Sequence, residues 1–165
     1  MDKQYSERGI NLLWMKKLIF SGIFIEENKL HAIYDRYNDL SCKQWLLLVI
    51  TNAFDDNPDL TKLSNAMGCS RQNVKKIALN VEKLGLITLE PSKNDKRSIL
   101  VVLTSKGRET IDKIEEMSEE IHNEFFKDFT DNEIETYYKL SIKIMNGIDN
   151  LNHYFMMKTN KALKK

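Results

Sequence analysis

The chain has 165 residues, which is enough for one domain with an added oligomerisation element. Apolar residues make up 42% of it and charged residues 30%, which suits a soluble protein with a hydrophobic core. Only two cysteines, two prolines and six glycines argue against a disulfide framework, a collagen-like repeat or a loop-rich all-β fold.

The net charge of +1 is unevenly distributed along the chain. Residues 61–108 contain ten basic and three acidic residues, whereas residues 109–135 contain eleven acidic and two basic ones. The basic segment is therefore a candidate surface for a polyanion such as nucleic acid. The alternative is a solvated helix face whose charges serve no partner.

The most apolar early stretch, residues 18–25, follows two lysines and superficially resembles a signal peptide. It is much shorter than the ~20 residues of a membrane span. It also leads into a Glu-Glu-Asn-Lys run without a cleavage site of small residues. We therefore expect a buried helix here, no membrane partner and, with reduced thiols, a cytoplasmic protein.

The first half of the chain has helical apolar spacing. Residues 8–37 predict a long helix whose apolar face is wide enough to need partners on more than one side. Ser41 and Gln44 have the spacing of a capping box, which predicts a second helix over residues 45–54. A loop follows at residues 55–58.

The next segment predicts two helices joined by a tight turn. A short helix is expected over residues 61–67, and Gly68 would end it, because glycine readily enters the left-handed region. Ser70 can cap a second helix that runs from residue 71 to residue 83 or 84, with apolar residues at helical spacing, and Gly85 would stop that helix.

Two β-branched-rich runs, residues 86–90 and 98–103, flank the polar loop 91–97 and predict a β-hairpin. Thr104 is then expected to cap a long helix over residues 105–127.

Thr130 and Glu133 form a second capping-box pattern, which opens a last helix. The lysine-rich tail from Lys158 is expected to fray. The predicted fold class is mainly α with one β-hairpin wing. A short helix, a turn, a second helix and a basic hairpin in that order predict a winged helix-turn-helix.

The second helix of this motif has the side chains that recognise DNA. Arginine pairs with guanine and Gln or Asn with adenine, while Lys and Ser bind phosphates. No acid lies between Asp59 and Glu82, whereas a face selected only for solubility usually mixes both signs. The candidate DNA-binding residues of this helix are Ser70, Arg71, Gln72, Asn73, Lys75 and Lys76.

The tip of the hairpin adds a second group of candidates. An arginine at a wing tip can enter the minor groove, where negative potential is concentrated. The candidates are Lys93, Asn94, Lys96 and Arg97. Asp95 is interpreted as a wing-stabilising residue that orients Arg97 or stiffens the loop, without touching DNA. The alternative for the whole loop is an ordinary solvated turn.

Residues 68–107 resemble the DNA-binding core of MarR-type transcription regulators. The resemblance lies in the turn 68–70, the Lys-Leu-Gly-Leu-Ile exit at 83–87, the wing sequence Asp-Lys-Arg-Ser at 95–98, and the Leu-Thr-x-x-Gly start of the long helix at 103–107. The order of helices before and after this core is similar as well.

The resemblance implies a homodimer on double-stranded DNA. Residues 1–37 and 128–165 would form the helical dimerisation region, and residues 38–127 the winged domain with its long connecting helix. Two recognition helices would then occupy successive major grooves of a palindrome, ~34 Å apart. The first and last helices are also too apolar for the outside of so small a monomer. The candidate dimer-surface residues are Ile10, Leu13, Trp14, Leu18, Ile142, Met145, Leu151 and Phe155.

The resemblance also implies a small amphipathic or phenolic ligand between the dimerisation helices and the winged domain. Aromatic residues in the corresponding segments are candidates for that pocket, although each is more often a core residue. They are Phe20, Phe24, Tyr34, Tyr37 and Trp45. Cys69, just before a helix, and Cys42 are weak candidates for oxidant sensing, since a buried packing role is commoner.

No catalytic motif, metal-ligand spacing or cofactor signature stands in the sequence, so we expect neither an enzyme nor a resident metal or cofactor. The leading hypothesis is a sequence-specific, dimeric transcriptional regulator, a repressor released by a small ligand. The alternative is a winged-helix adaptor that contacts proteins and not DNA. An adaptor would not need the acid-free basic helix face.

Overall fold

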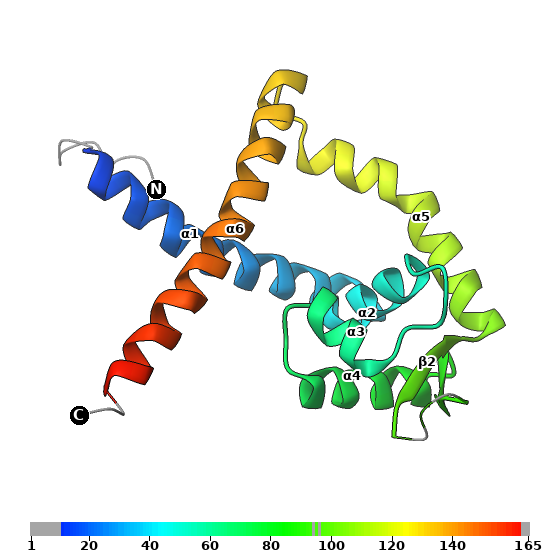
Figure 1. Ribbon diagram of the computed structural model, residues 1–165. Coiled ribbons are helices and arrows are strands. Elements are labelled where there is room, and N and C mark those ends of the chain that lie inside the picture. Colours follow the sequence, from blue (N-terminus) through cyan, green and yellow to red (C-terminus); the bar gives the residue numbers. More distant parts are fainter. Residues whose placement is uncertain (1–10, 94, 96, 163–165) are drawn as a thin grey trace. The chain divides into compact units, whose positions relative to one another are not determined.

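The structure is a computed structural model, and it describes residues 11–93, 95 and 97–162. Within these residues the chain forms six helices and one antiparallel hairpin (Figure 1). It divides into two compact units, Met1–Ile114 and Glu115–Lys165, so that the division falls inside the fifth helix. The predicted fold class, mainly helical with one hairpin wing, is confirmed.

The first two helices begin where polar side chains cap them. Helix α1 (Leu12–Tyr37) starts after Asn11, whose side chain accepts a hydrogen bond from the Trp14 amide at 2.9 Å. It therefore begins later than the predicted residue 8. Helix α2 (Cys42–Asn52) starts directly after the Ser41 capping box, three residues earlier than predicted.

Helices α3 (Leu60–Ala66) and α4 (Arg71–Lys83) form the helix-turn-helix. Asp59 caps α3, so this helix begins and ends one residue earlier than predicted. Ser70 caps α4, and the predicted span of α4 is confirmed.

Glycines end both of these helices. Gly68 has φ +63° and Gly85 has φ +74°, the left-handed conformation in which a side chain is strained. The predicted stops at both positions are confirmed.

The hairpin pairs β1 (Ile87–Pro91) with β2 (Ile99–Leu103). Each strand begins one residue later than predicted. An isolated bridge joins Asp59 to Leu100 on the outer edge of β2. Helices α2, α3 and α4 and the hairpin surround the core of the first unit, to which the start of α5 contributes Ile111. The buried apolar residues are Leu47, Leu48, Leu60, Leu63, Val74, Ile77, Ala78, Val81, Leu86, Ile87, Val101, Leu103 and Ile111.

Helix α5 (Ser105–Phe125) begins in close contact with the turn that follows α4. The Thr104 hydroxyl donates to the Gly85 carbonyl at 2.8 Å and accepts from the Gly107 amide at 3.0 Å. A Cβ on Gly107 would lie only 2.0 Å from the Leu86 carbonyl oxygen. Glycine at this position is therefore a packing requirement.

Helix α6 (Asp131–Ala162) opens with the predicted Thr130–Glu133 capping box. The expectation that the chain frays from Lys158 is wrong as far as Ala162. The Lys158 ammonium lies 4.9 Å from the centroid of the Tyr154 ring, and the Thr159 hydroxyl donates to the Phe155 carbonyl at 3.0 Å. These contacts support the last described turns of the helix.

Candidate nucleic-acid interface

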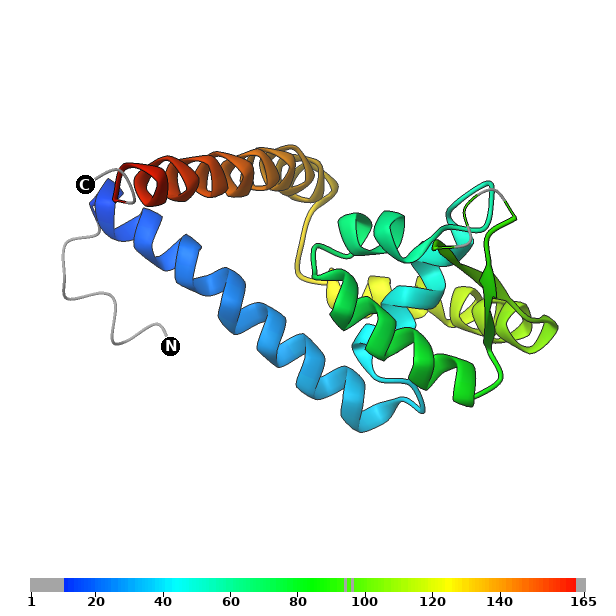
Figure 2. The ribbon, with the colours of Figure 1, turned by 60° about the horizontal axis from the view of Figure 1, so that its bottom comes forward.

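Helix α4 has a buried apolar face and an exposed basic face. Val74, Ile77, Ala78 and Val81 lie in the core, while the residues on the opposite face are exposed to solvent. The exposed candidates are Ser70, Arg71, Gln72, Lys75 and Lys76, and Asn73 is half-buried. The helix lies at the surface of the first unit, and the hairpin follows from its C-terminal end (Figure 2).

The N-terminus of α4 is electrostatically suited to a phosphate. Its first turn contains no acid, and Arg71 lies in that turn. Backbone amides at a helix start point outward and carry partial positive charge. The Ser70 hydroxyl accepts from the Asn73 amide at 3.3 Å and so satisfies one of these donors. The other amides at the start of α4 and the basic side chains beside them are all positive, so both would attract a phosphate.

The described part of the wing tip is exposed and internally bonded. Asp95 Oδ1 accepts from the Arg97 amide at 3.0 Å and from Arg97 Nε at 3.3 Å. The Arg97 side chain nevertheless remains 92% exposed, and Lys93 is exposed as well. Both hydrogen bonds are consistent with a carboxylate that orients Arg97. The role of Asp95 in stabilising the wing stays a prediction. Asn94 and Lys96 lie outside the described residues.

Two acidic residues that border the acid-free segment make hydrogen bonds within the helix-turn-helix and the wing, and neither was among the candidates chosen from the sequence. Asp59 binds the amides that begin α3 and the hydroxyl of Ser98. The backbone hydrogen bond from Lys62 is the main cause that lowers the pKa of Asp59. Burial opposes it, and the bonds from Thr61 and Ser98 lower the pKa further. Glu82, at the end of α4, accepts from the Leu89 amide of β1 at 2.8 Å.

The five aromatic candidates for a ligand pocket form two contacting pairs, and Tyr37 belongs to neither pair. The Phe20 and Phe24 rings are 5.6 Å apart, and the Tyr34 and Trp45 rings are 5.2 Å apart. Phe24 and Tyr34 are separated by roughly 15 Å along α1, from the rise of a helix. Tyr37 is 75% exposed. A pocket built from all five stays a prediction.

Both cysteines are partly buried free thiols. Cys69 packs against the hydrophobic core, as a packing residue would. Burial, followed by the nearby Asp35 carboxylate, raises the pKa of Cys42. A raised pKa keeps the Cys42 thiol protonated at neutral pH, which disfavours reaction with oxidants.

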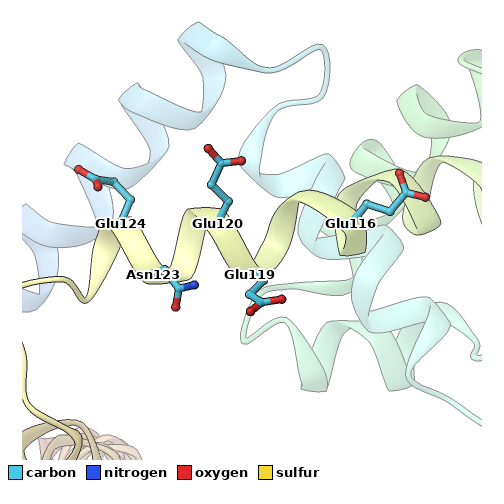
Figure 3. Close-up of a pocket in the computed structure, with 5 residues that line it drawn as sticks. All are labelled: Glu116, Glu119, Glu120, Asn123 and Glu124. Carbon is cyan, nitrogen blue, oxygen red and sulfur yellow. The ribbon is translucent and has the colours of Figure 1, made fainter.

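An acidic hollow lies on the part of α5 that belongs to the second unit. Glu116, Glu119, Glu120, Asn123 and Glu124 line it, and the carboxylates of the four glutamates point in different directions (Figure 3). Among the described residues, no group of three or more His, Cys, Asp or Glu side chains is arranged to hold a metal.

No helix in the described residues combines the length and apolar character that crossing a bilayer requires.

The geometry of unit one is that of a winged helix-turn-helix protein. The chain matches no sequence-family model and no curated protein sequence, but it is similar to solved structures. A MarR/EmrR family transcriptional regulator from Acinetobacter sp. ADP1 is 19% identical, with 86% of this chain and 99% of that one covered and a TM-score of 0.72. A MarR protein from Peptoclostridium difficile is 23% identical, with 81% and 88% covered and a TM-score of 0.73.

A third similar structure concerns the regulation of DNA binding of Bordetella bronchiseptica BpsR by 6-hydroxynicotinic acid. It is 19% identical, with 76% of this chain and 97% of that one covered and a TM-score of 0.65. The chain therefore has the MarR-type winged-helix fold, which the resemblance of residues 68–107 predicted.

Proposed function

We propose that this protein is a sequence-specific DNA-binding transcriptional regulator that acts in the cytoplasm as a homodimer, as a repressor. The observation that carries the proposal is the exposed, acid-free face of α4 beside an exposed wing arginine. Its DNA-contacting residues are Ser70, Arg71, Gln72, Asn73, Lys75, Lys76, Lys93, Asn94, Lys96 and Arg97. The shared fold with transcriptional regulators supports this function.

The proposed mechanism is geometric. Residues 1–37 and 128–165 of two chains form the dimerisation region, and each winged domain places α4 in a major groove. A small amphipathic or phenolic ligand that changes the spacing of the two α4 helices then lowers the affinity for the operator. Control of BpsR by 6-hydroxynicotinic acid is the precedent within this fold.

The proposal is tested by measuring the affinity for genomic DNA fragments at two salt concentrations. The Arg71→Ala/Arg97→Ala variant removes two charges from the proposed interface. Lys113→Ala/Lys127→Ala is the matched control, because both lysines are exposed and lie outside the proposed DNA interface and the proposed dimerisation region. We expect the first variant to bind at least about tenfold more weakly and the control to bind like the wild type.

Equal binding by all three proteins would contradict the proposed interface. Absence of binding by the wild-type chain would favour the adaptor function, in which the winged helix contacts a protein.

A further inference from the structure

The wing is held to the helix-turn-helix by one carboxylate at each of its outer edges. We call Asp59 and Glu82 the carboxylate clamp. They are the two acids that border the acid-free segment 60–81. Both are only partly exposed, and both point to the hairpin through hydrogen bonds.

The outer edge of β1 is bound by Glu82. Leu89 and Val101 face each other across the hairpin. The Leu89 amide donates outward to Glu82 Oε1 at 2.8 Å, and so the end of α4 is tied to the middle of β1. An edge amide without this acceptor would need water or another partner.

The outer edge of β2 is bound by the segment that precedes α3. The Val101 amide donates to the Pro58 carbonyl at 2.9 Å. Asp59 Oδ1 accepts from the Thr61 and Lys62 amides, each at 2.8 Å, and caps α3. Its second oxygen, Oδ2, accepts from the Ser98 hydroxyl at 3.3 Å, just before β2. One carboxylate therefore joins the first helix of the motif to the base of the wing.

We propose that Asp59 and Glu82 are positioning residues for DNA binding, which fix the wing so that Arg97 reaches DNA while α4 lies in the groove. This inference rests on the proposed function. Arg97 is at the exposed tip, so a small rotation of the hairpin at its base moves the guanidinium much further. Both carboxylates also face the hairpin. Their negative charges there repel DNA phosphates less than carboxylates on the exposed face of α4 would.

The test uses variants that separate positioning from folding. Asp59→Ser retains a capping oxygen for α3 but removes the second oxygen that binds Ser98. Glu82→Ala removes the acceptor for Leu89, and Glu82→Gln keeps an amide oxygen there as the conservative rescue. Hydrogen exchange of the Leu89 amide reports directly on the β1 bond, and thermal melting identifies any variant that does not fold.

DNA affinity is measured for Asp59→Ser/Glu82→Ala in the wild-type and Arg97→Ala backgrounds. We expect the double variant to bind about tenfold more weakly in the wild-type background and to add little once Arg97 is absent, because contacts that act through one another are not additive. Glu82→Gln should retain wild-type affinity, and Leu89 exchange should accelerate in Glu82→Ala.

Three results would overturn the inference while the wild-type chain still binds DNA. These are unchanged affinity in the double variant, an equal loss in both backgrounds, and unchanged Leu89 exchange in Glu82→Ala. If the wild-type chain binds no DNA, the proposed function itself fails, and the role of the clamp in DNA binding fails with it.

Discussion

At the scale of single residues, Asp59 combines local and distant roles. It caps α3 and also binds Ser98, which is 39 positions away in the sequence. A local pattern indicates the cap, because an aspartate directly before an apolar helix is a frequent N-cap. No local pattern indicates a partner at that distance, so the link to the wing was not predictable from the sequence.

The stability that Asp59 contributes should depend on pH. Its pKa is lower in the folded protein than in the unfolded chain. Asp59 therefore contributes its full stabilisation at pH values above its pKa in the unfolded chain. That stabilisation is lost as the pH falls through its pKa in the folded protein. We expect Asp59→Ala to reduce the free energy of unfolding by about 1 kcal/mol at pH 7, the usual value of an N-cap. The difference from the wild type should shrink in acid, as measured by denaturant unfolding between about pH 7 and pH 2, because a carboxyl with a lowered pKa takes up its proton only below about pH 5. A difference that does not change with pH would contradict the assigned role of the carboxylate.

Gly107 and Gly68 should respond differently to alanine. At Gly107 the new Cβ meets the Leu86 carbonyl, and we expect a loss of about 3 kcal/mol or more in unfolding free energy. At Gly68 nothing lies within 4 Å of the new Cβ, but φ is +63°, so only backbone strain of about 1 kcal/mol is expected. Thermal melts of both variants measure this difference. Equal losses would contradict the close approach of α5 to the turn.

At the scale of elements, the type of each helix and strand was predictable, because apolar periodicity, capping patterns and turn glycines agree locally. The boundary of α3 shifted because the Asp59 cap was overlooked, and that of α2 shifted because the helix begins directly after its Ser41 cap and not after Gln44. The exposed face of α4 was also predictable from residues 70–76 alone. The grouping of the aromatic residues was not, since spacing along α1 does not say which side chains meet.

Positions along α4 should divide into those that read sequence and those that bind phosphate. We expect Lys75→Ala to weaken binding similarly for all sequences and to reduce the slope of log affinity against log salt by about 1. Gln72→Ala should instead relax the preference at one base pair and leave that slope unchanged. Salt titrations on the preferred duplex and on single-substitution duplexes measure both quantities. Identical behaviour of the two variants would contradict a base-reading role for Gln72.

At the scale of the whole molecule, two helices have apolar surface that this chain alone leaves exposed. In α1, Leu13, Phe20 and Ile33 are each more than half exposed, and in α6 the same holds for Met145 and Phe155. Exposed apolar surface of this extent usually marks an interface. Among the candidates for the dimer surface, Trp14, Leu18 and Leu151 are half-buried, Leu13, Ile142, Met145 and Phe155 are exposed, and Ile10 lies outside the described residues.

A charge placed on that surface should separate the proposed dimer. We expect Met145→Glu to sediment as a monomer at micromolar concentration, because it would bury an unpaired charge. Asn150→Glu, at an exposed position on the side of α6 turned away from Met145, should remain dimeric. Sedimentation velocity distinguishes the two variants. A wild-type chain that sediments as a monomer at every concentration would contradict the dimer.

Selection of genomic fragments by the purified wild-type protein is the decisive test for a sequence-specific dimeric regulator. We expect enrichment of an inverted repeat with half-sites centred about one helical turn apart, and loss of that enrichment in Arg71→Ala/Arg97→Ala. Binding without enrichment, and with a steep dependence on salt, would show only contact with phosphates and would contradict a sequence-specific dimeric regulator.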